Sequence, residues 1–496
     1  MKPEDEIKVD ETTAADVAAE DTAPESAQDA AENEEDYFAP VEVPLKKPRV
    51  KRKDLPPAER KRRNIRDIII TCTVCGLVLV FFAILALCSY VGYTGNYKYI
   101  DTVEALPEDY SDFEMNYDES LGYYVFSPKN GASAEDFTVL QLTDIHIGAG
   151  AFSAQKDRWA LQAVEETIKA VQPDLVIVTG DVAYPVPFQA GTFDNQREAD
   201  MFGELMDKLG VYWTLAFGNH DTEAYSLHDR DEIGDYYYAK ASSGDWEKCL
   251  FRKDPVGKDL SGVGNDMILL KDSDGKIVHS FVTLDSHSYT DGDYFGIAWK
   301  YDNIKSDQVY WYASEIKRLS EINGNAAGDF IASTVYFHIP LREYGVYYEA
   351  AKNGSDKAEL LFGVAGESGE KSFPGMYNDT LFETMILYNG QGTFCGHDHY
   401  NNYSLEVTET VYYNVDDNGI MIPVEVTDGA TAANCASGTV RLTYGMSIDY
   451  LAYVGIASKV EQRGGTEIRV ALEDGSISLR QRPLVSLAET ANAAFV

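Results

Sequence analysis

The sequence has few basic residues, few histidines and few cysteines for its length. Of 496 residues, 42 are Lys or Arg against 81 Asp or Glu, which gives a formal net charge of −39. Such a chain lacks the basic surface that binds nucleic acid through counterion release, so we expect no nucleic-acid binding. Six cysteines are too few for a disulfide-built scaffold or a Cys-rich zinc site. Cys249, Cys395 and Cys435 leave room for one disulfide beyond residue 91.

The N-terminal region has few large apolar side chains. Residues 1–40 hold 14 Asp or Glu against two Lys, so we expect residues 1–45 to form an acidic disordered cytoplasmic tail. The sign of the charge then reverses, because residues 46–67 contain eleven Lys or Arg. This basic juxtamembrane segment is the kind of sequence that stays on the cytoplasmic side of a membrane.

One long stretch lacks charge altogether. Residues 68–91 read IIITCTVCGLVLVFFAILALCSYV. As a helix these 24 residues span about 36 Å, enough to cross a bilayer core. The run is longer than the core of a signal peptide and lies far from the N-terminus, so we expect a retained transmembrane helix. With the basic segment before it, the prediction is a single-pass plasma-membrane protein whose catalytic part is extracytoplasmic.

Beyond this run, short apolar segments alternate with helical patterns. Residues 92–134 form a polar lead-in, and the segments at about 222–262 and 341–374 resemble insertions. The alternation predicts an α/β sheet with crossover connections. The expected strands are 137–142, 174–181, 211–220, 267–270, 277–286 and 332–340, and the expected helices are 155–171, 197–209, 305–321 and 376–389.

Five of the eight histidines stand at the ends of predicted strands, beside Asp, Asn or Gly. The segments are Asp144-Ile145-His146, Gly180-Asp181, Gly218-Asn219-His220-Asp221, His338 and Gly396-His397-Asp398-His399. Because ligands bind at the carboxyl ends of strands in open α/β sheets, we expect these segments to converge on one pocket. Their mixed oxygen and imidazole donors suit divalent zinc, manganese or iron.

This ordered set of motifs resembles the calcineurin-like metallophosphoesterases over residues 136–410, with further likeness to about 460. The resemblance implies an α/β (α+β) fold, in which two mixed sheets form a four-layer β-sandwich flanked by helices. It places the phosphoesterase domain at 135–460, followed by a C-terminal β segment and tail at 461–496.

The resemblance also implies residue roles. Asp144, His146 and His399 would bind one metal ion, and Asn219, His338 and His397 would bind a second, with Asp181 bridging both. His220 would donate a proton to the leaving oxygen, and Asp221 would orient His220. The implied reaction is hydrolysis of phosphate mono- or diesters by a hydroxide that two divalent ions, Mn, Zn or Fe, activate.

Two segments also resemble the purple acid phosphatases. Gly180-Asp181-Val182-Ala183-Tyr184 fits their Gly-Asp-x-x-Tyr, and Val335-Tyr336-Phe337-His338 fits their Val-x-x-His. Those enzymes lack the histidine of the first motif, whereas His146 is present here. We therefore expect His146 to bind metal and Tyr184 to form packing or the pocket wall. The alternative to an enzyme is a non-catalytic cell-surface binding protein that retains the fold.

Overall fold

The computed structural model describes residues 51–290, 292–293, 296–425 and 434–496. The acidic tail predicted at 1–45 lies outside these residues. The chain divides after Thr73 into two units, and the second, Val74–Val496, contains the end of the first helix and both sheets. All six cysteines are free thiols, so the structure contains no disulfide among Cys249, Cys395 and Cys435.

Helix α1 (Pro57–Ile100) contains the whole apolar run. Among the described residues it is the one helix that is long and apolar enough to cross a membrane. Residues 68–84 are all exposed, and a buried stripe then begins at Leu85. Its members recur every three or four residues, which is the spacing of one helix face: Leu85, Ser89, Gly92, Asn96 and Ile100.

The strands form two mixed sheets. The larger has ten strands, in the order β1 (Phe113–Asp118), β2 (Tyr123–Pro128), β6 (Asp266–Lys271), β7 (Ile277–Thr283), β8 (Ala332–Tyr336), β10 (Gly390–Cys395), β13 (Asn434–Tyr444), β11 (Ser404–Val415) and β12 (Met421–Pro423), with β9 (Ala358–Phe362) paired to β11. The smaller has five, in the order β15 (Ile477–Pro483), β14 (Gly464–Ala471), β3 (Asp136–Leu142), β4 (Leu175–Thr179) and β5 (Trp213–Ala216).

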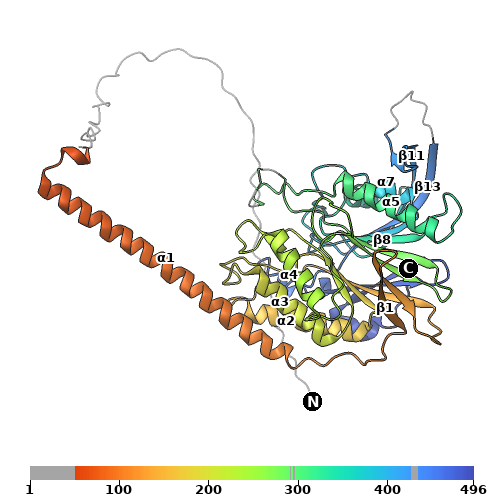
Figure 1. Cartoon of the computed structure of the whole chain (residues 1–496), viewed down its shortest axis with the longest axis horizontal. Helices are drawn as coiled ribbons and strands as arrows, with labels where there is room; N and C mark the ends of the chain where they lie inside the picture. Colours follow the sequence, from red (N-terminus) through yellow and green to blue (C-terminus); the bar gives the residue numbers. More distant parts are fainter. Residues whose placement is uncertain (1–50, 291, 294–295, 426–433) are drawn as a thin grey trace, which may run out of the picture. The chain divides into compact units, whose positions relative to one another are not determined.

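Helices cover the outer face of each sheet. Helices α2 (Ala154–Val171), α3 (Asn195–Leu209) and α4 (Arg230–Ser243) pack on the smaller sheet. Helices α5 (Ser306–Ile322), α6 (Arg342–Lys352) and α7 (Leu381–Leu387) pack on the larger. Figure 1 shows α2, α3 and α4 on one side of the strands and α5 and α7 on the other.

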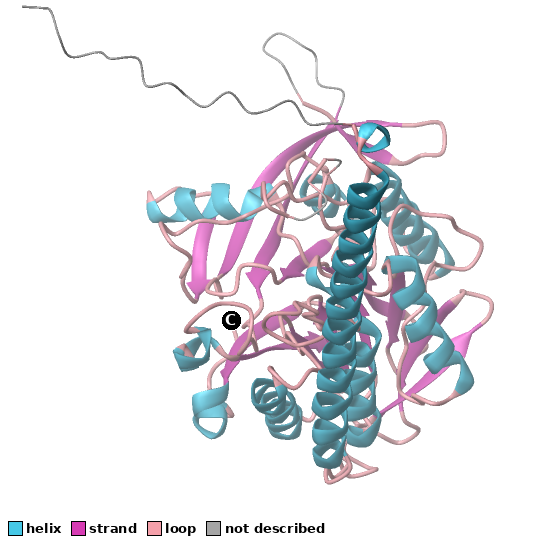
Figure 2. Cartoon of the chain, turned by 90° about the vertical axis from the view of Figure 1, so that its left-hand side faces the viewer, coloured by secondary structure: helices cyan, strands magenta, loops and turns pink. Residues whose placement is uncertain are grey.

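A third apolar core lies between the two sheets, where Phe137 of β3 stacks on Phe281 of β7 with their ring centroids 5.5 Å apart. The strands therefore form the two inner layers, coloured magenta in Figure 2, and the helices form the outer layers. This confirms the predicted sandwich.

The structure differs from the sequence prediction in the segments expected to be irregular. Helix α4 lies in the first insertion, and α6 and β9 lie in the second. Strands β1 and β2 of the lead-in pair with the larger sheet. Strand β14 pairs with β3 from Thr466 to Ala471, so the β segment predicted within 461–496 belongs to the smaller sheet. The sandwich thus uses residues on both sides of the domain limits at 135 and 460.

Candidate metal centre

The motif residues follow the carboxyl ends of five strands. Asp144 and His146 come after β3, Asp181 after β4, and Asn219 after β5, all in the smaller sheet. His338 follows β8, and His397 and His399 follow β10, which are strands of the larger sheet. Both sheets therefore contribute side chains to one edge of the sandwich.

The backbone is unusual at these loops. Asp144, His146, Asp181 and His397 have positive φ angles of 50°, 52°, 53° and 76°, a region that non-glycine residues rarely adopt. Such strain clusters at functional sites, where the surrounding structure holds it in place. A Cβ on Gly218 would lie 2.1 Å from Asp181 Oδ1, so only glycine allows β5's loop to approach this carboxylate.

Buried carboxylates and imidazoles converge at this edge. Ligand atoms of Asp144, His146, Asp181 and His399 all lie within 4.8 Å of one another, and all four residues are buried. Asp181 Oδ2 lies 3.3 Å from His146 Nε2 and 3.1 Å from His338 Nε2. The structure therefore brings these four predicted ligands together, and His338 contacts the same Asp181 oxygen as His146.

Asn219 and His397 lie beside this group. His397 Nδ1 is 3.0 Å from Asn219 Oδ1. The Asn219 amide nitrogen donates to the hydroxyl of Tyr289 over 3.0 Å, which leaves its oxygen toward the histidines. Within the described residues, the buried His338 Nε2 makes no hydrogen bond, although Asp181 Oδ2 lies 3.1 Å away. Unpartnered imidazole nitrogens beside carboxylates are what a divalent metal site requires, so the residues fit such ions.

Outer groups fix the ring orientations. His338 Nδ1 lies 2.8 Å from the carbonyl oxygen of Thr179, which leaves Nε2 facing Asp181. His399 Nδ1 lies 2.9 Å from Asp449 Oδ2, and His146 Nδ1 lies 3.4 Å from Asp449 Oδ1. One carboxylate thus contacts two proposed ligands, the usual way in which a metal-binding imidazole is oriented.

The carboxylate beside His220 is Glu223 and not Asp221. Glu223 Oε1 lies 2.8 Å from His220 Nδ1. The Asp221 carboxylate instead accepts hydrogen bonds from the backbone N–H groups of Asp181, Ala183 and Gly218. The prediction that Asp221 orients His220 is therefore corrected: this carboxylate faces backbone donors and braces the loops that follow β4 and β5.

Glu223 belongs to a short network. It accepts a hydrogen bond from the hydroxyl of Tyr289 over 2.9 Å, and that hydroxyl in turn accepts a hydrogen bond from the Asn219 amide. Tyr289 therefore links a proposed metal ligand to the partner of His220. Sequence reasoning missed Asp449, Glu223 and Tyr289. The sequence signal for Glu223 was its position three residues after His220, directly after the short turn His220–Thr222.

Charges within the site shift several pKa values. Burial alone would raise the pKa of Asp181, but the neighbouring His338 and His220 outweigh it and hold that pKa well below its ordinary value. Burial, and next the charge of His338, holds the pKa of His397 well below the ordinary value, so this ring is neutral and can act as a ligand. Burial also opposes protonation of His220, yet Asp181 and Glu223 outweigh it and raise its pKa.

Tyr184 lies next to the site without joining the ligand group. Its hydroxyl donates to Gln189 Oε1 over 3.0 Å and to the Ala452 carbonyl oxygen over 3.3 Å. Its ring lies edge-on to His146, with 5.1 Å between centroids. The Tyr184 hydroxyl is therefore turned toward Gln189 and Ala452, while its ring packs against His146.

A pocket of about 340 Å³ opens over the histidines. Five of its lining residues are polar: His220, Glu367, His397, Asp398 and His399. The remaining lining residues are aromatic: Trp299, Tyr301, Phe373, Tyr400 and Tyr453. The pocket therefore combines titratable groups with aromatic side chains.

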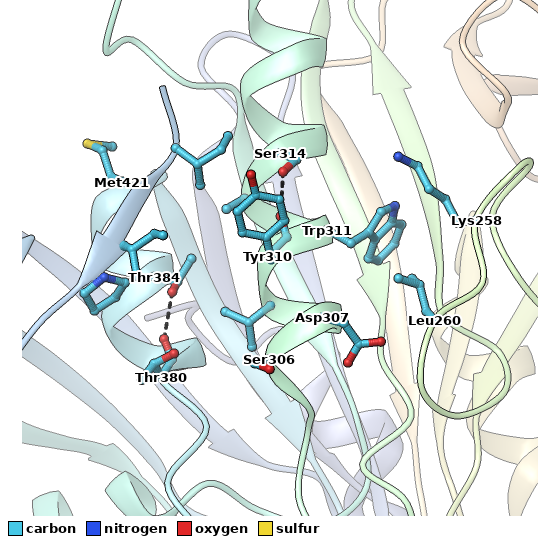
Figure 3. A pocket seen from close by; sticks show the side chains of 15 residues that line it. Lys258, Leu260, Ser306, Asp307, Tyr310, Trp311, Ser314, Thr380, Thr384 and Met421 are labelled. Carbon is cyan, nitrogen blue, oxygen red and sulfur yellow. Dashed lines mark hydrogen bonds between the residues drawn. The ribbon is translucent and has the colours of Figure 1, made fainter. Parts of the chain in front are cut away.

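A larger cavity, of about 600 Å³, lies elsewhere, between α5, α7 and β12 (Figure 3). Asp307 is its one carboxylate, and it contains no histidine. The Ser314 and Thr384 hydroxyls bond within their own helices, to the carbonyl oxygens of Tyr310 and Thr380. The lining therefore offers no comparable set of metal ligands.

The fold and the site define a two-sheet α/β sandwich with a buried carboxylate and imidazole cluster at its strand ends. The family model described as calcineurin-like phosphoesterase matches residues 137–401. The chain belongs to this family.

Two curated relatives match about half of the chain. "Probable inactive purple acid phosphatase 14" of Arabidopsis thaliana is 27% identical over 300 residues, which cover 55% of this chain and 67% of that protein. "Phosphatase DCR2" of Saccharomyces cerevisiae is 25% identical over 293 residues, which cover 55% of this chain and 46% of that protein. A solved structure covering 70% of this chain and 99% of its own matches with a TM-score of 0.33 and 11% identity, which is too low to add to the assignment.

Proposed function

We propose that the chain is a membrane-anchored phosphoesterase that uses two divalent metal ions to hydrolyse phosphate mono- or diesters outside the cytoplasm. Membership of the calcineurin-like phosphoesterase family supports phosphoester chemistry. The observation that carries the proposal is the convergence of two buried imidazoles, those of His146 and His338, on the Asp181 carboxylate.

We infer that Asp144, His146 and His399 hold one ion, that Asn219, His338 and His397 hold the other, and that Asp181 is shared. The position of Asp181 Oδ2, 3.3 Å from His146 Nε2 and 3.1 Å from His338 Nε2, supports this division, because one carboxylate reaches both groups. When bound, two divalent ions supply Lewis acidity toward phosphoryl oxygens and an activated water. Zinc, manganese and iron all suit this donor set.

His220 is the group that we propose protonates the leaving oxygen. Its side chain is 25% exposed and lines the pocket, whereas the side chains of His146 and His338 are fully buried. Glu223 lies on the Nδ1 side, so the Nε2 side is the one available to a substrate. The raised pKa of His220, caused by Asp181 and Glu223 against the effect of burial, keeps the ring protonated at higher pH, as a general acid requires.

The membrane anchor rests on α1 and its flanks. The helix carries the uncharged run at 68–91, and eleven Lys or Arg lie in the segment before it. That asymmetry favours a cytoplasmic N-terminus and an extracytoplasmic catalytic domain.

The second candidate is a non-catalytic binding protein with the same fold. One relative is named as inactive, which makes this alternative specific. It predicts that the chain binds metal and phosphate esters without turnover. The presence of His220 with its Glu223 partner favours the enzyme.

The test is hydrolysis of p-nitrophenyl phosphate and bis-p-nitrophenyl phosphate by the full chain in detergent, after chelation and return of manganese, zinc or iron. We expect metal-dependent turnover that Asp181→Asn abolishes. Asp474→Asn, which changes an exposed carboxylate on the β14–β15 turn, is the matched control and should retain activity. Metal-independent turnover, or equal turnover in Asp181→Asn, would contradict the proposal.

A further inference from the structure

The last part of α1 packs directly against the catalytic domain, with no flexible linker between them. The Arg197 guanidinium donates to Ser89 Oγ over 2.9 Å, and the Asn96 amide donates to the Ala154 carbonyl oxygen over 3.2 Å. The hydroxyls of Tyr93 and Tyr97 both bond to Asp200 on α3. These contacts couple the helix to the domain as one packed body.

Glycines allow this contact to be close. A Cβ on Gly92 would lie 2.2 Å from the Gly150 backbone, so the helix and the loop after His146 touch through their main chains. A Cβ on Gly191 would lie 3.3 Å from Cys88 and 3.2 Å from the ring of Phe152. Cys88 belongs to the apolar run, so these loops of the domain lie at the level of its last turns.

The length of the run makes this overlap informative. Residues 68–84 are all exposed, and the face that packs on the domain begins at Leu85. Those 17 residues rise about 25 Å, whereas a hydrocarbon core is about 30 Å thick. About three more residues are needed to cross it, which brings the membrane boundary to the level of Cys88 and its neighbours.

Two exposed aromatic side chains stand at this level. Phe152 is 59% exposed and borders Gly191, and Phe188 is 85% exposed and lies three residues before that glycine. The two loops are joined, because the Phe152 amide donates to the Ala190 carbonyl oxygen over 3.2 Å. Exposed aromatic rings beside a membrane span are what the boundary between headgroups and acyl chains accommodates.

We propose that residues 150–153 and 186–191 form a membrane foot, which inserts Phe152 and Phe188 into the bilayer that α1 crosses. The foot rests on the proposed membrane anchor. It also fixes how far the metal centre can lie from the membrane, because Phe152 is only six positions after His146 in the sequence. Their Cα atoms therefore lie within about 22 Å of each other. The site would act close to the membrane surface, on phosphate esters that are bound to or held near it.

The test is photocrosslinking of the full chain in phosphatidylcholine vesicles. Benzoylphenylalanine is introduced at one position at a time, first in place of Phe152 or Phe188. The same replacement of Phe81, within the apolar run, is the positive control, and that of Val346 is the negative control. Val346 is 63% exposed on α6. We expect lipid adducts at Phe152 and Phe188 at about the level seen at Phe81, and background at Val346. An unchanged thermal unfolding midpoint shows that each variant is folded.

The possible outcomes distinguish the membrane foot from the two other proposals, the membrane anchor and the esterase activity. Adducts at Phe81 without adducts at Phe152 or Phe188 would overturn the foot alone. A chain without adducts at Phe81 would overturn the anchor and the foot together. Hydrolysis of p-nitrophenyl phosphate, measured on the same vesicles, reports separately on the esterase activity. Lipid adducts without hydrolysis would contradict the proposed activity and still support the foot.

Discussion

At the scale of single residues, the chemistry of the site depends on groups that carry no motif. The convergence of the motif residues could be predicted because they follow apolar strands, and such strand ends meet at one edge of the fold. Asp449 could not, since it lies five residues beyond the end of β13 and reaches His399 only through the fold. Asp221 was misjudged because adjacency in sequence does not decide which carboxylate faces an imidazole.

Glu223 should control the protonation of His220. Its carboxylate helps to raise the pKa of His220, so Glu223→Gln should lower that pKa and reduce the protonated fraction. We expect the alkaline limb of the kcat profile to move to lower pH, with kcat falling by about 10-fold or more at neutral pH. The control is Glu232→Gln, because Glu232 lies 3.4 Å from the partly exposed His228 on the surface. If the pH profile of kcat in Glu223→Gln is unshifted, Glu223 does not control the protonation of His220.

Asp449 should act on metal affinity rather than on the chemical step. It orients His399 and lies against His146, so Asp449→Asn should weaken metal binding by about 10- to 100-fold. Competition with a chromogenic chelator measures this affinity, and kcat at saturating metal should change much less. Equal affinity in the variant and the parent chain would show that Asp449 has no such function.

At the scale of helices and strands, the apolar elements were predictable and the polar ones were not. Strands β3, β4 and β8 appear in the sequence as short apolar runs, because both of their faces are buried. Helix α4 buries only Ile233, Gly234 and Tyr237, so its sequence lacks an apolar stripe. Strands β1 and β2 were hidden because their pairing with distant β6 cannot be read from local pattern.

The packing of β7 against β8 makes a prediction about acid stability. His279 on β7 is buried, with Nδ1 2.7 Å from the Gly475 carbonyl oxygen and Nε2 3.0 Å from Thr334 Oγ1. Burial lowers the pKa of His279 to about 4, below the value of about 6.5 expected when unfolded. The unfolded state therefore binds more protons between these values, and stability should rise with pH across that window.

The expected contribution of His279 is up to about 3 kcal/mol above pH 6.5, lost progressively as the pH falls toward 4. Urea unfolding of the full chain in detergent, at several pH values between 4 and 7, measures it. His279→Gln should flatten the dependence in this window, whereas His228→Gln, at a partly exposed position, should leave it unchanged. A parallel slope in His279→Gln and the parent chain would contradict the assignment.

At the scale of the whole molecule, three features combine: an apolar helix, a sandwich of two mixed sheets and a cluster of ligands at the edge that both sheets share. The fold class was accessible from sequence because the motifs occur in a fixed order, and the ligand set inferred from the same motifs stays a prediction. The docking of α1 was not, because the buried stripe from Leu85 to Ile100 lies partly within a run that is uniformly apolar.

The most direct test of the central claim is the metal content of the purified full chain. After dialysis against manganese or zinc, elemental analysis should give two ions per chain, and Asp181→Asn should lose both metal and phosphate-ester turnover, because Asp181 is proposed to bind both ions. Fewer than two ions in an active parent chain, or an unchanged content in Asp181→Asn, would contradict a shared two-metal centre.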